Sequence, residues 1–323
     1  MQKRILLIST DFFNYHQLIQ KELESQGWQV TYLNDRPSGN TFLKILIRKV
    51  RFLIEWYLNY FYSKKIENLG VFDHVLIIKG EGITPKIINK IKKNHCRGKI
   101  YLYLWDGIKN SVGALENAKV VDKTLTFDSE DSEKFKFDLL PLFYVSKSSE
   151  KNVRPQKWNV SFVGSIHGDR LKVIQAVKKY LNNNSEFFIF VYFPSRLLFH
   201  VSKLLDASFQ YFNQNELSLK SIAKSQADDI FNQSVAVLDI HHAHQTGLTM
   251  RTLEVLSLGK KLITTNEAIK KYSFYDTTAI CVIDRKKPYI DALFFKTDVP
   301  SDYTDRLKPY ELTNWVKKLT ITI

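Results

Sequence analysis

The sequence predicts an α/β protein made of two doubly wound, Rossmann-like domains that face a cleft, and three observations support this prediction. Short apolar runs rich in β-branched residues recur along the chain, as at 4–9 and 234–240, and such runs are typical of buried parallel strands. A polar loop and then apolar residues at helical spacing follow these runs, which is the order of a βαβ unit. The length of 323 residues suits two domains of ordinary size.

Composition and charge narrow the classes of partner. Hydrophobic residues make up 44% of the chain and aromatic residues 13%, which is enough for globular cores. Lys and Arg number 47 against 33 acidic residues, so the formal charge is +14 and favours nucleic acid, anionic lipid or nucleotide sugars as partners. Two cysteines and an opening apolar run too short for a signal peptide are consistent with a cytoplasmic protein.

The first domain is expected to span residues 1–150. Apolar runs predict strands at 4–9, 27–33, 71–79, 99–105 and 124–128, and helical spacing predicts a helix over 15–26. No Gly-x-Gly-x-x-Gly follows the first strand, which argues against a dinucleotide site there.

Acidic residues stand where four of these strands end. Asp11, Glu81, Asp106 and Asp128 are therefore expected to ring one crevice at the carboxyl edge of the sheet. A carboxylate there can act as the general base toward an acceptor hydroxyl if its pKa is raised toward neutrality. Glu81 ranks first because glycines flank it, then Asp106, then Asp11. The alternative for each is an ordinary capping or loop acid, and capping is the expected role of Asp128.

Residues 41–65 predict a long helix dense in Leu, Ile, Phe, Trp and Tyr. Its polar residues fall on one narrow stripe, Lys44, Arg48, Arg51, Glu55 and Asn59. The apolar runs of this helix are too short to span a bilayer. The helix is therefore expected to be either a core helix with one solvent-exposed edge or a helix that lies against an anionic membrane surface.

A polar segment at 146–157 predicts the linker, and the second domain is expected at 151–304. Strands are predicted at 158–165, 187–193, 234–240, 262–265 and 280–284. Helices are predicted at 171–180, 194–207, 217–230, 288–295 and 305–319.

The stretch 241–259 is the most informative in the chain. It follows a predicted strand, contains a polar loop with Gly247 and continues into a short helix, and such a loop and helix N-terminus suit an anionic ligand. Arg251 adds a positive charge for phosphate, and Glu254 offers a carboxylate to a ribose diol. The alternative is a solvated Arg–Glu surface pair. Of the three histidines, His244 is expected to bind phosphate or sugar, because no cysteine or acid completes a metal site.

The segment 246–264 resembles the donor-nucleotide segment of bacterial glycosyltransferases of the GT-B fold, and is most similar to spore-maturation-B-like and capsule or lipopolysaccharide glycosyltransferases. This resemblance implies that Glu254 binds the donor ribose. It also implies that Thr246, Gly247, Leu248, Thr249 and the helix N-terminus hold the diphosphate. Val-Gly-Ser165 and Arg170 resemble the first donor loop of the same fold, and the family implies a C-terminal helix over 305–323 that crosses back to the first domain.

The expected function is therefore metal-independent transfer of a sugar from a nucleotide-diphosphate sugar, with no cofactor, to a glycan or lipid-linked acceptor in bacterial surface polysaccharide synthesis. The chain contains no Asp-x-Asp, P-loop or Gly-x-Ser-x-Gly motif. The sequence therefore does not support metal-dependent transfer by the other major glycosyltransferase fold, nucleotide triphosphate hydrolysis or serine hydrolase chemistry. Two alternatives stay open, a nucleotide-sugar epimerase of the same fold and a basic nucleic-acid-binding protein.

Overall fold

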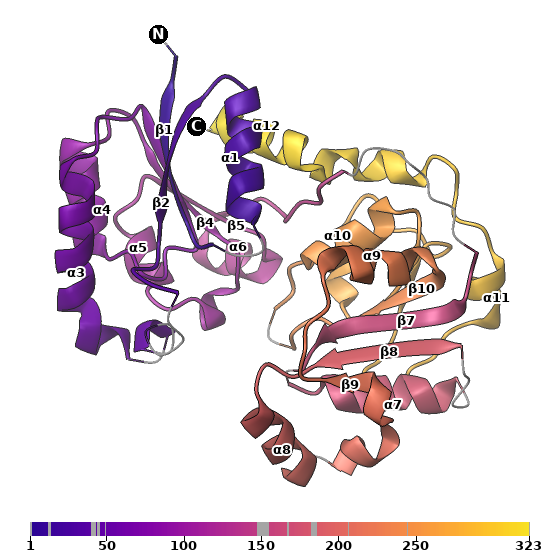
Figure 1. The fold of residues 1–323 in the computed structure, drawn as a ribbon. Helices are drawn as coiled ribbons and strands as arrows, with labels where there is room; N and C mark the ends of the chain where they lie inside the picture. Colours follow the sequence, from indigo (N-terminus) through magenta and orange to yellow (C-terminus); the bar gives the residue numbers. More distant parts are fainter. Residues whose placement is uncertain are drawn as a thin grey trace. The chain divides into compact units, whose positions relative to one another are not determined.

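The computed structural model describes residues 2–11, 14–39, 43, 46–48, 50–146, 155–166, 168–181, 186–205, 207–243 and 245–322. The chain divides into two compact units (Figure 1). Unit 1 comprises Met1–Phe143 and Tyr310–Ile323, and unit 2 comprises Tyr144–Pro309. The division falls at Phe143, slightly before the expected boundary at 150, which itself lies outside the described residues.

Unit 1 contains a six-stranded parallel sheet in the order β2-β1-β3-β4-β5-β6. The strands are β1 (Arg4–Ser9), β2 (Gln29–Asn34), β3 (His74–Ile78), β4 (Ile100–Leu104), β5 (Lys123–Thr126) and β6 (Asp138–Leu139). The first five confirm the strands expected from the apolar runs. The two-residue edge strand β6 was not predicted, because two residues carry no measurable periodicity.

Helices cover both faces of this sheet (Figure 1). α3 (Arg51–Glu67), α4 (Pro85–Asn94) and α5 (Ala114–Ala118) cover one face, and α1 (Tyr15–Ser25) and α12 (Leu312–Thr322) cover the other. Asp128 accepts from the backbone N–H groups of Glu130 and Asp131 and so caps α6 (Ser129–Phe135), as its sequence context predicted.

The C-terminal helix α12 belongs to unit 1. The indole of Trp315 is fully buried there, lies edge-on to Tyr103 at 5.0 Å and donates to the carbonyl of Pro141 at 3.1 Å. The segment before α12 forms the 3-10 helix η5 (Tyr303–Tyr310), so the predicted single helix over 305–319 is two elements separated by Glu311.

Unit 2 repeats the plan with the parallel order β12-β11-β10-β7-β8-β9. The strands are β7 (Trp158–Ser165), β8 (Phe187–Tyr192), β9 (Leu217–Ser218), β10 (Ser234–Asp239), β11 (Lys261–Thr264) and β12 (Ile280–Val282). The helices are α7 (Arg170–Tyr180), α8 (Arg196–Leu205), α9 (Lys224–Asn232), α10 (Met250–Ser257) and α11 (Ala292–Lys296). The two parallel sheets with flanking helices confirm the predicted fold class.

Two predicted helices of unit 2 were too long. Residues 217–218 are an edge strand rather than helix, and α9 begins only at Lys224, after Ala223 in extended conformation. In the predicted helix 288–295, Asp291 accepts from the N–H of Leu293, so the helix begins after this cap.

Candidate functional site

Both units have their polar clusters at a topological switch point, the place where successive strands depart to opposite sides of the first strand. In unit 1 that point lies between β1 and β3, and in unit 2 between β7 and β10. Ligands of open parallel sheets bind outside the carboxyl ends of the strands at such points.

Arg170 closes the switch point of unit 2. It is the first residue of α7, donates from Nη1 to the carbonyl of Ser165 at 2.9 Å, and donates from Nε and Nη2 to the carbonyl of Ile240 at 3.1 and 2.8 Å. Burial lowers the pKa of Arg170 to about 10, which leaves it charged at neutral pH. Arg170 and Ser165 therefore brace the ends of β7 and β10, a role that the sequence did not predict for them.

Three arginines gather here. The positive charges of Arg251 and Arg285 both act on the Arg170 guanidinium and lower its pKa, whereas the carboxylates of Asp239 and Asp169 raise it. Arg285 donates from Nη1 to Asp169 at 2.6 Å and from Nη2 to the carbonyl of His241. Clustered like charges repel, so this end of the sheet is suited to an anion.

His241 is neutral in this setting. Burial, with the nearby Arg285, lowers the pKa of His241 to about 4, and its Nδ1 lies 2.8 Å from the Thr265 hydroxyl. Among the described residues, no group of three or more His, Cys, Asp or Glu is arranged to hold a metal ion. His244 lies outside the described residues.

Hydrogen bonds from Asn266 and the burial of Leu248 hold the loop before α10 in place. Asn266 Nδ2 donates to the carbonyls of Thr246 at 3.0 Å and Gly247 at 3.4 Å, and the Leu248 side chain is fully buried. Thr249 is the N-cap of α10, because its hydroxyl accepts from the N–H of Thr252 at 3.2 Å. These contacts hold the backbone of residues 246–249 in one conformation.

Asp239 supports that cap. Its Oδ2 accepts from the hydroxyls of Thr249 at 3.0 Å and Thr252 at 2.6 Å, and the carboxylate is almost fully buried at the end of β10. A buried carboxylate with two charge-assisted hydrogen bonds holds the start of α10 against the sheet.

Arg251 and Glu254 both turn toward α9. The guanidinium of Arg251 lies 5.2 Å from the ring centre of Phe231, and Glu254 pairs with Lys224. Glu254 retains 16% side-chain exposure, and Lys224 retains 49%. The two residues predicted to bind the donor thus lie on one side of α10, beside a lysine that the sequence did not single out.

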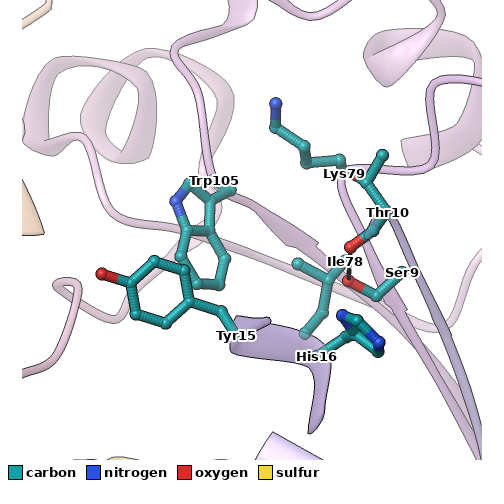
Figure 2. Close-up of a pocket in the computed structure, with 7 residues that line it drawn as sticks. All are labelled: Ser9, Thr10, Tyr15, His16, Ile78, Lys79 and Trp105. Carbon is teal, nitrogen blue, oxygen red and sulfur yellow. Dashed lines mark hydrogen bonds between the residues drawn. The ribbon is translucent and has the colours of Figure 1, made fainter. Parts of the chain in front are cut away.

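In unit 1 a small pocket opens at the switch point (Figure 2). Its lining residues come from the ends of β1, β3 and β4 and from the start of α1, and they are Ser9, Thr10, Tyr15, His16, Ile78, Lys79 and Trp105. The rings of Tyr15 and Trp105 lie side by side, with centroids 5.7 Å apart. Figure 2 shows Thr10 and Lys79 across the pocket from these rings.

Lys79 connects the pocket to the predicted acids. Its Nζ lies 2.6 Å from Asp106 and 3.7 Å from Glu81. Lys79 has a φ of 69°, in the left-handed region that lysine rarely adopts, and such strain clusters at functional sites. Asp11 is 63% exposed and lies 3.4 Å from Nδ1 of His16.

Glu81 does not meet the condition set for a general base. Burial alone would raise its pKa, but Lys79, Arg36 and Arg48 together lower the pKa of Glu81 to about 2. Arg36 lies 2.5 Å and Arg48 3.1 Å from its oxygens. Glu81 is thus the anionic centre of a buried ion cluster.

The neighbouring acid Asp35 behaves in the opposite way. Burial raises the pKa of Asp35 to about 6, although Arg36 lowers it, and its Oδ2 accepts from the N–H of Glu81 at 3.2 Å. Gly82 makes this packing possible, because a Cβ at that position would lie 2.0 Å from the carbonyl oxygen of Asp35. Asp35 was not predicted as a site residue, because it follows a strand that is only half-buried along most of its length.

Comparison with known proteins adds information on fold. No protein-family model matches this sequence, and no curated protein matches it significantly. Solved structures do match over nearly the whole chain. A trehalose-6-phosphate synthase has 11% identity and a TM-score of 0.66, covering 99% of this chain and 98% of the other.

Two further structures widen the comparison. The lipopolysaccharide outer core galactosyltransferase WaaB has 12% identity and a TM-score of 0.56, covering 98% of both chains. A putative UDP-N-acetylglucosamine 2-epimerase from Listeria monocytogenes has 10% identity and a TM-score of 0.57, covering 99% of this chain and 95% of that one. The chain therefore has the GT-B fold, as the resemblance of its donor segment implied.

Proposed function

We propose that the protein is a glycosyltransferase that takes a sugar from a nucleotide-diphosphate donor held by unit 2. The observation that carries this proposal is the gathering of Arg170, Arg251 and Arg285 at the switch point of unit 2, where Asp239 and Asp169 offset part of the positive charge on Arg170. A donor diphosphate supplies the missing negative charge.

The structure supports separate roles for the residues around this anion site. Arg251 and Arg285 would contact the diphosphate, together with the backbone of Thr246–Thr249 and the N-terminus of α10. Glu254 would accept from the ribose hydroxyls once Lys224 shifts its contact. Arg170 would act through position, since its donors already hold the carbonyls of Ser165 and Ile240.

Fixed positive charge would stabilise the departing nucleotide diphosphate in place of a metal. The bond from the donor sugar to the diphosphate breaks, and a bond from that sugar to the acceptor oxygen forms. The proton of the acceptor hydroxyl passes to a base.

Unit 1 would receive the acceptor outside the carboxyl ends of β1, β3 and β4, because the pocket beside Trp105 has room for no more than a water molecule. Trp105 would offer a ring to the apolar face of a sugar there, and Lys79 a donor. Of the three acids predicted as base, we propose Asp106, which among the described residues pairs with Lys79 alone, at 2.6 Å, and is 34% exposed. Glu81, by contrast, is 4% exposed and is held by Arg36, Arg48 and Lys79. An acceptor in bacterial surface polysaccharide synthesis, glycan or lipid-linked, follows from the resemblance of the donor segment.

The epimerase alternative keeps the donor site and needs no acceptor. It is favoured by the likeness to UDP-N-acetylglucosamine 2-epimerases, and it predicts interconversion of a nucleotide sugar without release of the diphosphate. The transferase predicts release of the diphosphate in step with acceptor glycosylation.

A ligand-induced thermal shift tests the donor site. UDP, GDP and CMP are compared with a single-stranded oligonucleotide, and one nucleotide is expected to raise the melting temperature. A nucleotide at 100 times its Kd contributes about 2.7 kcal/mol. Arg251→Ala and Glu254→Ala should each weaken binding about 10–100-fold, the loss expected for a charged hydrogen bond.

Arg306→Ala is the matched control. Like Arg251, Arg306 is an arginine of unit 2 whose guanidinium lies over an aromatic ring, 5.6 Å from the ring centre of Tyr303, but it lies on η5 rather than at the switch point. Its loss should leave the nucleotide shift intact. Stabilisation by the oligonucleotide alone would favour the nucleic-acid-binding alternative instead.

A further inference from the structure

Helix α3 of unit 1 turns polar residues inward. The guanidinium of Arg51 is buried and donates to the carbonyls of Ile83 at 2.6 Å and Val112 at 3.1 Å. Asn59 accepts from the hydroxyl of Thr84 at 2.5 Å. The predicted polar stripe is therefore not a wet edge over these residues; Lys44 lies outside the described residues, and Glu55 is exposed.

The outward face of α3 is apolar in addition to the buried face formed by Leu58, Tyr62 and Ile66, whereas an ordinary surface helix has a polar outward face. The exposed fractions are 74% for Phe52, 57% for Leu53, 72% for Trp56 and 57% for Tyr60. Residues 52, 56 and 60 follow one another at intervals of four, so they lie along one side of the helix. We call these four residues the α3 apolar face. Three such rings and a leucine leave on the order of 400–500 Å² of apolar surface open.

Basic side chains lie at the C-terminal end of this face and beside Trp56 and Tyr60. Lys64 continues the row, with its Nζ 4.6 Å from the ring centre of Tyr60, and Lys65 lies 5.7 Å from the ring centre of Phe61. Beside Trp56 an open groove is lined by Glu55, Trp56, Asn59, Tyr60, Ser63 and Lys86. Glu55 is the one acid that lines this groove.

We propose that the α3 apolar face docks on an anionic lipid membrane, with α3 lying in the plane of the interface. Trp and Tyr favour the boundary between headgroups and acyl chains, where lysines reach up to the phosphates. A 17-residue helix is about 25 Å long and lies flat on such a surface. None of the helices in the described residues is long and apolar enough to span a bilayer.

The composition and size of the face favour lipid over a second copy of the chain. A stable interface between copies buries about 800 Å² per partner, nearly twice what the α3 apolar face offers. Lys86 and Ser63 supply donors for a headgroup phosphate in the groove next to Trp56. The net charge of +14 adds attraction to an anionic surface.

This inference goes beyond the proposed function, because membrane binding is measured without donor or acceptor. The test is co-sedimentation of the full chain with vesicles of phosphatidylcholine alone and of phosphatidylcholine with one quarter phosphatidylglycerol. We expect at least tenfold tighter binding to the anionic vesicles. We also expect the double variant Phe52→Ser/Trp56→Ser to lose at least tenfold in that binding.

A control variant removes a similar exposed apolar pair from unit 2. Tyr289 and Leu293 are 69% and 64% exposed, and Tyr289→Ser/Leu293→Ser should change vesicle binding by less than twofold. Wild-type protein that stays in the supernatant, or a control that loses as much as the α3 variant, would overturn the proposal.

Folding and oligomeric state are checked on the same samples. Far-UV circular dichroism and thermal melting should show the Phe52→Ser/Trp56→Ser variant folded, because neither side chain is buried. A wild-type dimer in sedimentation velocity that becomes a monomer in this variant would assign the face to a second copy and contradict the membrane inference. Lys86→Gln should weaken binding to anionic vesicles and leave binding to neutral ones unchanged.

Discussion

Replacing Glu81 by glutamine tests whether this carboxylate stabilises unit 1 or serves as a base. Its side chain is 4% exposed, and the Arg36 and Lys79 side chains that face it are 10% and 12% exposed. Removing one member of a buried charge cluster costs about 3–5 kcal/mol, because the remaining cations stay buried without their counter-charge.

The pKa of Glu81 gives a second measure of how much its carboxylate contributes to the free energy of unfolding. The pKa of Glu81 falls from 4.5 to about 2 in the folded chain. A depressed carboxylate pKa adds stability that is present above pH 4.5 and lost as the pH falls through 2. At 1.36 kcal/mol per pH unit this is about 3 kcal/mol, close to the first figure.

The assay is urea unfolding followed by tryptophan fluorescence. Four of the five tryptophans, Trp28, Trp56, Trp105 and Trp315, belong to unit 1, so the signal reports mainly that unit. At pH 7 Glu81→Gln should lower the free energy of unfolding by about 3–5 kcal/mol, and the acid-induced loss between pH 4.5 and 2 should shrink.

Glu67→Gln is the matched control, since Glu67 is 60% exposed and only 3.9 Å from Lys90. Its cost should be below about 1 kcal/mol. An unfolding curve for Glu81→Gln that coincides with the wild type, together with lost catalysis, would refute the structural role and restore Glu81 as the base.

Two further predictions concern buried acids and their partners. Burial raises the pKa of Asp35 from 3.8 to about 6, so its ionisation removes stability as the pH rises through this range; Asp35→Asn should flatten that decline in urea unfolding between pH 4 and 7, and an unchanged profile would contradict it. Thr252→Val keeps the side-chain shape but removes the 2.6 Å hydrogen bond to Asp239, which should cost about 1.5–3 kcal/mol in calorimetry, and a Thr252→Val variant as stable as the wild type would show that the hydroxyl contributes nothing.

The sequence predicted the sheets well because their central strands, such as β1, β3 and β4, are buried on both faces. Runs such as Ile5–Ile8, with no exposed side chain, leave little doubt about a parallel core strand. The predicted loop and helix at 246–257 are confirmed for the same reason, since Leu253, Val255 and Leu256 are fully buried at helical spacing.

Local sequence patterns did not predict the contacts between residues that are far apart in the chain. Arg285 follows the short strand β12 and reaches Asp169, 116 positions earlier, and no local pattern encodes that distance. A basic residue just past a strand end was its only signal. Lys224 reaches Glu254 from another helix in the same way.

Helix α3 shows a different limit. Its polar stripe was visible in the sequence, but periodicity does not tell which side of a helix faces the protein. Arg51 lies inward, where it donates to the carbonyls of Ile83 and Val112, whereas Phe52, Trp56 and Tyr60 are exposed and Tyr62 is buried.

The most direct test of the account is a screen of nucleotide sugars for release of free nucleotide diphosphate. Each is incubated with the protein and a mixture of glycan and lipid-linked acceptors, with Arg251→Ala, Glu254→Ala and the control Arg306→Ala run in parallel. We predict that one nucleotide sugar releases its diphosphate in an acceptor-dependent manner, that the first two variants lose this activity at least tenfold, and that the control keeps it. Conversion to an epimer without diphosphate release, or release that is unchanged in Arg251→Ala and Glu254→Ala, would contradict the proposed transferase site.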